Sequence, residues 1–196
     1  MTLKQRTIAF IGGGHITRII LENLTRSGKT AGSHLTVSDP DRRKREALLK
    51  KFGVQIAESN QQAIDVADFI FFNVLPQVVG PVLNELRKQK FPKDKTIISL
   101  AAGIPMKTYA VLGDRIPVVR ALPNPPSQIG KGIAALAFNP YISEPQKNDV
   151  IELFSCLGKY VILQEDKINA VTALSSPVTT HLFFQAIIDT AVRLGI

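Results

Sequence analysis

The sequence is poor in the residues that disulfide-rich and metal-stabilised proteins need. It has one cysteine, Cys156, and three histidines among 196 residues. A single cysteine excludes an internal disulfide framework, and the scattered histidines have no cysteine or carboxylate cluster at metal-ligand spacing. We therefore expect no metal. We expect Cys156 to be a packed thiol in an apolar helix rather than a nucleophile, because no partner base is evident.

Long apolar runs are missing as well. No stretch of 18 apolar residues occurs, and the first six residues lead into a strand without the apolar region of a signal peptide. These absences favour a cytoplasmic protein that does not enter a membrane. With 45% hydrophobic residues, the chain has enough apolar material for one domain of ordinary size and a short extra element.

Acidic residues are fewer than basic ones, 16 against 24, which gives a formal net charge of +8. Much of the excess lies in two basic patches, at residues 42–51 and 87–95. Neither patch has the interleaved aromatic residues or the motifs typical of nucleic-acid binding. We therefore expect no nucleic-acid partner, and interpret the charge as an attraction for anionic cofactors or as a source of solubility.

A glycine-rich stretch at residues 7–17 passes from an apolar strand through three glycines into an amphipathic helix. Gly12 allows a tight turn, and Gly14 lets a pyrophosphate approach the free N–H groups and the positive dipole end of the helix. Thr17 stands where the third glycine of the motif is expected. The pattern predicts a dinucleotide-binding site.

The second predicted strand, residues 34–38, ends at Asp39, near the position where such a fold has its ribose-binding carboxylate. The carboxylate favours a free 2′-hydroxyl and hence NAD, whereas Arg42 and Arg43 could bind the 2′-phosphate of NADP. These signals conflict and leave NADP and NAD both open. In an alternative interpretation, residues 39–41 cap the next helix and the arginines lie on its solvated face.

Strands and helices alternate along most of the chain, which is typical of a parallel sheet covered on both faces. Ser143 and Gln146 predict a capping box, and Gly158 is expected to end the helix that they begin. From Lys167 the pattern is helical, with an apolar stripe that must be buried against the first unit or another chain. We expect strands at residues 7–11, 34–38, 54–56, 68–74, 96–100, 116–121, 132–138 and 160–163.

Five motifs in order resemble those of pyrroline-5-carboxylate reductases. They are the glycine loop, Asn-Val-Leu-Pro-Gln at 73–77, Ile-Ser-Leu-Ala-Ala-Gly at 98–103, Val-Val-Arg-Ala-Leu-Pro-Asn at 118–124, and segments between 166 and 195. The resemblance implies an oxidoreductase of proline biosynthesis that transfers hydride from NADPH or NADH to the imine 1-pyrroline-5-carboxylate. It implies an α/β fold: a Rossmann-type, doubly wound, mostly parallel sheet at 1–166, followed at 167–196 by the start of an all-α dimerisation and substrate domain. The expected partners are therefore a small-molecule substrate and a second copy, bound through the C-terminal helix.

The resemblance also assigns residues to parts of the site. The glycine loop would hold the pyrophosphate, residues 38–43 the adenosine ribose and Asn60 the adenine side, while the loops after three strands would line the nicotinamide. The implied substrate residues are Glu165, Ser175 and Ser176, and no catalytic residue is assigned. The implied cofactor-binding residues are Gly12, Gly13, Gly14, His15, Ile16, Thr17, Ser38, Asp39, Arg42, Arg43, Asn60, Asn73, Val74, Leu75, Pro76, Ala101, Ala102, Gly103 and Asn124.

Several positions depart from the family pattern. The family usually has Asn or Gln at His15 and Lys at Leu75, and the loop at 175–177 is two glycines shorter than its counterpart. Glu165 is also interpretable as a solvated helix start, and His181 as a packed or interfacial residue. Two alternatives to the reductase follow: a dinucleotide-binding homologue without this activity, acting as a sensor or partner-binding module, or a reductase of another small substrate, such as an F420-linked NADP oxidoreductase.

Overall fold

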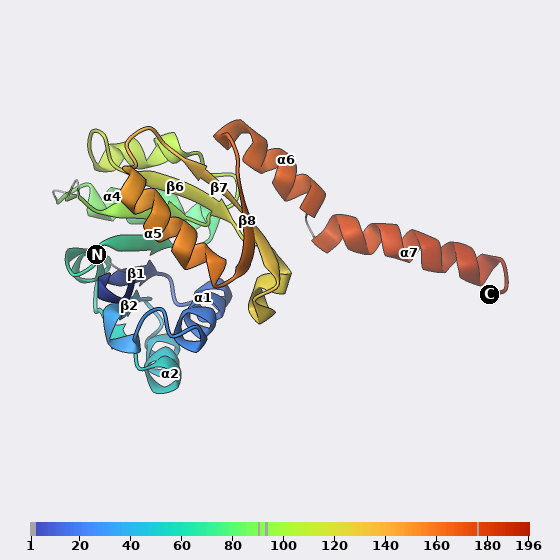
Figure 1. The fold of residues 1–196 in the computed structure, drawn as a ribbon, viewed down its shortest axis with the longest axis horizontal. Helices are drawn as coiled ribbons and strands as arrows, with labels where there is room; N and C mark the ends of the chain where they lie inside the picture. Colours follow the sequence, from blue (N-terminus) through green and yellow to red (C-terminus); the bar gives the residue numbers. More distant parts are fainter. Residues whose placement is uncertain (1–2, 90, 93, 176) are drawn as a thin grey trace.

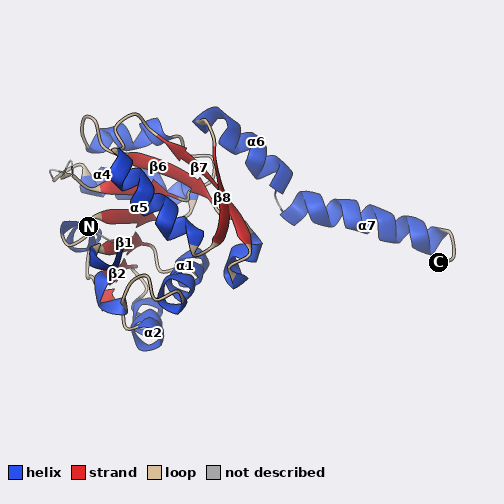
Figure 2. Ribbon diagram, in the orientation of Figure 1, coloured by secondary structure: helices blue, strands red, loops and turns tan. Residues whose placement is uncertain are grey.

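A computed structural model describes residues 3–89, 91–92, 94–175 and 177–196. Eight strands form one sheet in the order β3-β2-β1-β4-β5-β6-β7-β8 (Figures 1 and 2). Every neighbouring pair is parallel except β6 and β7, which are antiparallel. The strands are β1 (Ile8–Ile11), β2 (Leu35–Ser38), β3 (Gln55–Ile56), β4 (Phe69–Phe72), β5 (Thr96–Ser99), β6 (Val118–Leu122), β7 (Gly132–Phe138) and β8 (Gly158–Ile162). The order of the first six strands is that of a Rossmann fold, so the predicted fold class is confirmed.

Helices cover both faces of the sheet. One buried apolar cluster contains residues of α3, α4 and α6, and the other contains residues of α1, α2 and α5. Two 3-10 segments, η3 (Met106–Leu112) and η4 (Pro125–Ile129), were not expected from the sequence. The helices are α1 (His15–Arg26), α2 (Arg42–Phe52), α3 (Asn60–Asp65), α4 (Pro76–Leu86), α5 (Glu144–Ser155), α6 (Glu165–Ser175) and α7 (Pro177–Arg193).

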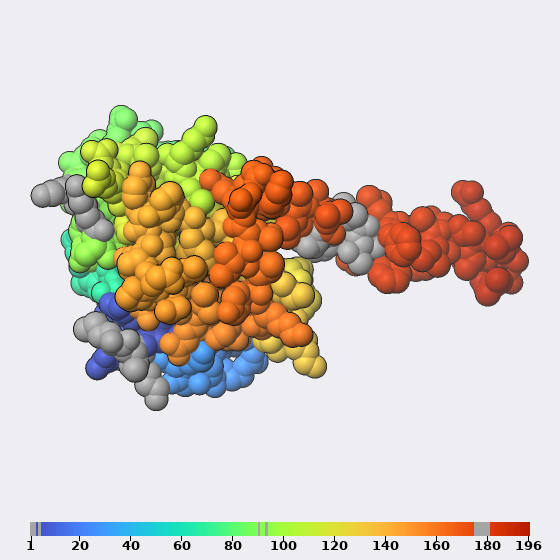
Figure 3. All heavy atoms as spheres, turned by 45° about the horizontal axis from the view of Figure 1, so that its top comes forward, coloured from blue at the N-terminus to red at the C-terminus, as the bar shows by residue number. Residues whose placement is uncertain are grey.

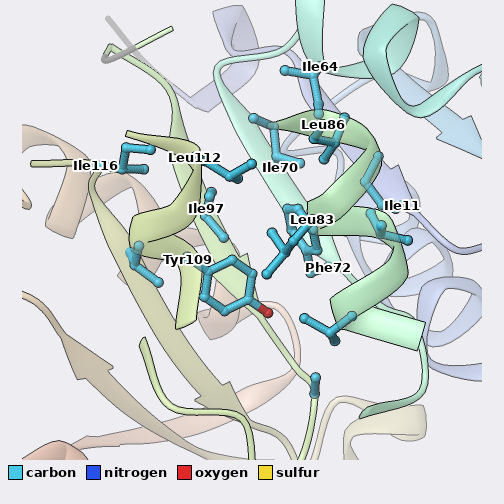
Figure 4. Packing of buried hydrophobic residues seen from close by; sticks show 14 of the residues in the cluster. Ile11, Ile64, Ile70, Phe72, Leu83, Leu86, Ile97, Tyr109, Leu112 and Ile116 are labelled. Carbon is cyan, nitrogen blue, oxygen red and sulfur yellow. The ribbon is translucent and has the colours of Figure 1, made fainter. Parts of the chain in front are cut away.

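The central strand β4 explains why its sequence is apolar without alternation. Phe69 and Phe71 belong to one cluster, and Ile70 and Phe72 to the other, so both faces of the strand are buried. On the second face, Tyr109 from η3 packs edge-on against Phe72, with ring centroids 5.1 Å apart. Figure 4 shows this contact beside Leu83 of α4. The phenol hydroxyl donates a 2.7 Å hydrogen bond to Ser99 Oγ at the end of β5.

Two boundaries show where local sequence signals succeed and fail. The capping box is confirmed, because Ser143 and Gln146 exchange hydrogen bonds at the start of α5. The prediction that Gly158 ends this helix is wrong, since α5 ends at Ser155 and Gly158 is the first residue of β8. Its φ is +132°, and an added Cβ would lie 2.2 Å from the carbonyl oxygen of Gly132. This glycine therefore allows β8 to approach β7 closely.

The C-terminal helices differ in how they contact the sheet domain. Ile168 of α6 is buried in the cluster that also contains Tyr109. Helix α7 extends away from the domain and ends at the far side of the molecule (Figures 1 and 3). It exposes large apolar side chains at Leu182, Phe183, Phe184, Ile187, Ile188 and Val192. No helix of the described residues is both long enough and apolar enough to cross a membrane.

Replacing Tyr109 by Phe removes a buried hydrogen bond without changing the ring packing. We expect Tyr109→Phe to lower the free energy of unfolding by about 1 kcal/mol at neutral pH, measured by urea denaturation. The matched control Tyr141→Phe alters a phenol at an exposed position and should leave stability unchanged.

A comparison of the wild-type protein with Tyr109→Phe also tests the titration of the buried phenol. Burial raises the pKa of Tyr109 to about 12, whereas the unperturbed value is 10.0. Between these values the unfolded chain releases the proton before the folded one, so stability declines as the pH rises from about 10 to 12. Tyr109→Phe lacks this loss, so the difference in free energy of unfolding between the wild-type protein and Tyr109→Phe should narrow as the pH rises. A pH-independent difference would contradict the burial of this group.

Candidate functional site

A cavity of about 940 Å³ opens at the carboxyl ends of the parallel strands. Residues that follow β1, β2, β4, β5 and β6 line it, together with the starts of α1 and α3 and one side of α4. In an open sheet with this strand order, a ligand crevice forms where the connections leave β1 and β4 on opposite faces. The cavity therefore lies where the fold places a dinucleotide.

The glycine loop at the end of β1 leaves space on its cavity side and none behind it. Gly12 has φ of +101°, and an added Cβ would lie 2.8 Å from the carbonyl oxygen of Asn73. Gly14 is the N-cap of α1, supplies no capping side chain, and would have open space around an added Cβ. The start of α1 thus offers backbone N–H groups and a positive dipole end to an anionic group, which fits a pyrophosphate.

Thr17 holds this loop to the neighbouring strand. Its buried hydroxyl donates a hydrogen bond to the carbonyl oxygen of Gly12, and it accepts one from Asn73 Nδ2 at 3.0 Å. The residue that replaces the third glycine of the motif therefore connects the ends of β1 and β4. Both residues were predicted as cofactor residues: Asn73 also lines the cavity, whereas Thr17 lies outside the lining and shapes the loop.

Asp39 joins the glycine loop to the end of β2. Its side chain is 8% exposed, and one carboxylate oxygen accepts the Gly13 N–H while the other accepts the Asp41 N–H, both at 2.8 Å. Ser38 Oγ donates to Asn60 Oδ1 at 2.9 Å. All three of Ser38, Asp39 and Asn60 line the cavity, as predicted for the adenosine end.

Arg42 and Arg43 lie outside the cavity lining. Arg42 is 82% exposed and donates to Glu46 at 2.7 Å, a hydrogen bond that raises the pKa of this arginine. Asp41 caps α2 by accepting the Arg43 N–H. The structure thus has the alternative arrangement, in which an aspartate caps the helix and the arginines lie on its solvated face. Lys44, which the sequence did not single out, lines the cavity instead.

The nicotinamide end of the cavity is mostly apolar. Val74, Leu75, Pro76, Ala101 and Ala102 line it as predicted, with Leu100, Leu122 and Pro123 beside them. Leu75 is 63% exposed. His15 and Ile16 also line the cavity.

Two predicted residues do not reach this lining. Gly103 follows Ala102 with φ of +75° and lies outside the lining residues. Asn124 Oδ1 accepts the Ile133 N–H at 2.8 Å, so its side chain supports the turn before β7. At the start of α1, Nε2 of His15 lies 3.3 Å from Nε2 of Gln128 in η4.

Glu165 makes contacts within the fold rather than in the cavity. One carboxylate oxygen accepts the Met106 N–H at 2.6 Å and lies 3.9 Å from the guanidinium of Arg120. Arg120 is 4% exposed and donates to Asn169 Oδ1 at 2.7 Å. The arginine thus connects β6 to two residues of α6 and fixes the direction in which that helix leaves the sheet.

The other residues singled out in the sequence are not among the described residues that line the cavity. Ser175 is the last residue of α6, and Ser176 lies outside the described residues. Cys156 is partly buried at the end of α5, with Sγ 3.4 Å from Ser27 Oγ. His181 is exposed on α7. Within the described ranges, no group of three histidine, cysteine or acidic residues comes close enough to hold a metal ion.

Comparison with known proteins identifies the family. The chain is 32% identical to the pyrroline-5-carboxylate reductase of Escherichia coli K12 over 97% of its own length and 72% of the relative. It is 34% identical to that of Pseudomonas aeruginosa over 96% and 70%, respectively. The chain belongs to the pyrroline-5-carboxylate reductase family. A family model described as NADP oxidoreductase coenzyme F420-dependent also matches residues 7–103.

Solved structures of the family have the same fold. The pyrroline-5-carboxylate reductase of Coxiella burnetii superposes with a TM-score of 0.87 at 29% identity, covering 97% of this chain and 72% of that one. The enzyme of Plasmodium falciparum with NADP bound gives 0.82 at 22% identity, over 98% and 71%. The family assignment thus agrees with a cavity that fits a dinucleotide.

Two glycines of the loop should respond differently to alanine. Gly12→Ala places a Cβ against Asn73 at a positive φ, so we expect both lower thermal stability and loss of NADH and NADPH binding. Gly14→Ala has room for its Cβ and should keep stability, yet weaken binding about tenfold or more because the methyl group occupies the approach to the pyrophosphate. Unchanged binding in Gly14→Ala would place the cofactor elsewhere.

The contacts of Glu165 predict a structural effect. Glu165→Ala leaves the Met106 N–H without its acceptor and Arg120 without its nearby carboxylate, so we expect the free energy of unfolding to fall by about 1 to 3 kcal/mol. Asp166→Ala, at an exposed neighbour, is the control. Equal stability of both variants in urea denaturation would show that the Glu165 contacts do not stabilise the fold.

Proposed function

We propose that the protein is an NAD(P)H-dependent imine reductase that converts 1-pyrroline-5-carboxylate to L-proline. The observation that supports this most is the continuous cavity from Asn60 past Gly14 to Leu122, which has an anion-binding helix start in its middle and apolar residues at one end. Family membership indicates the substrate class. A bound nicotinamide would supply the hydride, so the site needs no nucleophile from the protein.

The residues of the cavity have three parts in this reaction. The N–H groups at the start of α1 hold the pyrophosphate, and the Ser38–Asn60 pair lies at the adenosine end. At the other end, Val74, Leu100 and Leu122 exclude water from the reacting atoms and orient the face of the nicotinamide ring. In our proposal Ser175 and Ser176 hold the carboxylate of the substrate.

The exposed apolar residues of α7 support a homodimer through this helix. Phe183, Ile187 and Leu194 recur at spacings of four and seven, and these three and Leu182 are solvent-exposed in the single chain. A helix with this much exposed apolar surface gains stability by packing against a second copy.

A dinucleotide-binding homologue without this activity is the second candidate function. Two observations favour it: the exposed Leu75 at the nicotinamide end, and a loop at 175–177 without the glycines that would present N–H groups to a carboxylate. Such a protein would bind the cofactor and sense its concentration or present it to a partner.

Cofactor binding and turnover measured on one sample distinguish the two functions. We expect nicotinamide fluorescence to report saturable binding and the absorbance at 340 nm to fall when 1-pyrroline-5-carboxylate is added, with proline as product. Saturable binding without proline would favour the homologue without activity. Absence of binding to both NADH and NADPH would overturn both candidates.

The homodimer is tested by charge placed on α7. We expect the chain to be a dimer in analytical ultracentrifugation and Phe183→Glu to shift it to monomer by at least about tenfold in dissociation constant, because a charge would be buried in the contact. Gln185→Glu adds the same charge on the polar stripe formed with His181 and Asp189 and should remain dimeric. A wild-type chain that stays monomeric would refute the dimer.

A further inference from the structure

The adenosine end of the cavity is dominated by carboxylates. Among the described residues that line the cavity, the charged side chains are Asp39, Lys44, Glu58 and Glu85. Three carry negative charge and one carries positive charge. Asp39 follows β2, Lys44 is in α2, Glu58 lies between β3 and α3, and Glu85 is in α4. A doubly charged phosphate at this end would therefore meet more like charge than opposite charge.

Asp39 cannot turn away from a ligand at this end. Its carboxylate is almost fully buried, and hydrogen bonds from the N–H groups of Gly13 and Asp41 fix both oxygens. These two bonds leave lone pairs free, because an ionised carboxylate accepts about four hydrogen bonds. A ribose 2′-hydroxyl can donate to such an oxygen, whereas a 2′-phosphate dianion has no proton to donate and is repelled.

Three of the nearby cations already have partners. Lys44 Nζ lies 3.9 Å from Asp39 Oδ1. Arg45 donates to Glu58 at 2.8 Å and to the carbonyl oxygen of Ala57 at 3.0 Å. Arg42 is held by Glu46, and both Arg42 and Arg43 lie outside the cavity lining. Binding a 2′-phosphate through Lys44, Arg45 or Arg42 would require these pairs to be broken or rearranged.

We propose that this cavity selects NAD(H) over NADP(H), and that Asp39 is the residue that determines the choice. This inference rests on the proposed function in one respect, namely that a dinucleotide occupies the cavity. It departs from what the names of matched proteins indicate, since both the family model and the Plasmodium falciparum structure refer to NADP. Asp39 thereby has two roles: it shapes the glycine loop, and it accepts a hydrogen bond from the ribose 2′-hydroxyl.

The test is a pair of dissociation constants measured by nicotinamide fluorescence, without turnover. We expect the wild-type chain to bind NADH at least about tenfold more tightly than NADPH, because only NADH lacks the repelled phosphate. Asp39→Asn keeps the size of the side chain and one acceptor oxygen while it removes the charge. In this variant we expect the ratio of the dissociation constant for NADPH to that for NADH to fall by about tenfold or more, with NADPH binding improved.

One lysine variant and one arginine variant serve as controls. Lys44→Gln removes the cation of the lining and should weaken NADPH more than NADH, which raises the ratio. Arg43→Gln removes the same charge outside the lining and should leave the ratio within about twofold. A thermal-shift measurement on each variant checks that it folds.

The outcomes separate this inference from the proposed function. Wild-type protein that binds NADPH as tightly as NADH, or more tightly, would overturn the inference and leave the reductase standing. The inference would also fail if Asp39→Asn weakened both cofactors equally, since that would show a structural role alone. Failure to bind either cofactor would refute both proposals.

Discussion

The cofactor site depends on the close approach of the glycine loop to the ends of its neighbouring strands. Gly12 leaves no room for a side chain beside the Asn73 carbonyl, and the Thr17 hydroxyl connects the same two segments. On the other side the Asp39 carboxylate accepts the Gly13 N–H. Because β1 is thus held to both β4 and β2, the start of α1 is fixed at the centre of the cavity before any ligand arrives.

Burial gives these polar contacts their importance. Thr17 and Asp39 are buried, where an unpaired hydroxyl or carboxylate would be costly, and each makes hydrogen bonds to specific backbone groups. The Arg120–Glu165–Asn169 contacts have a similar role at the other end of the sheet, where they hold α6 against β6. One polar cluster fixes the cofactor loop, and the other fixes the helix that leads to α7.

The sequence predicts the sheet and the position of the cavity better than it predicts which side chains line that cavity. The apolar runs of β1, β4 and β5 and the glycines at their ends predicted the sheet and the position of the cavity, because these signals are local. Lys44 replaces Arg42 and Arg43 at the cavity because the helical rotation of α2 decides which side chain faces inward. The contacts of Glu165 were not predicted, because its partners, Met106 and Arg120, are distant in sequence.

A crystal structure of this chain with NADH bound would test the account most directly. We predict the pyrophosphate against the N–H groups that follow Gly14, the adenosine ribose with its 2′-hydroxyl on Asp39, and the nicotinamide beside Leu100 and Leu122. A dinucleotide bound outside this cavity, or one whose pyrophosphate does not contact the start of α1, would contradict the account.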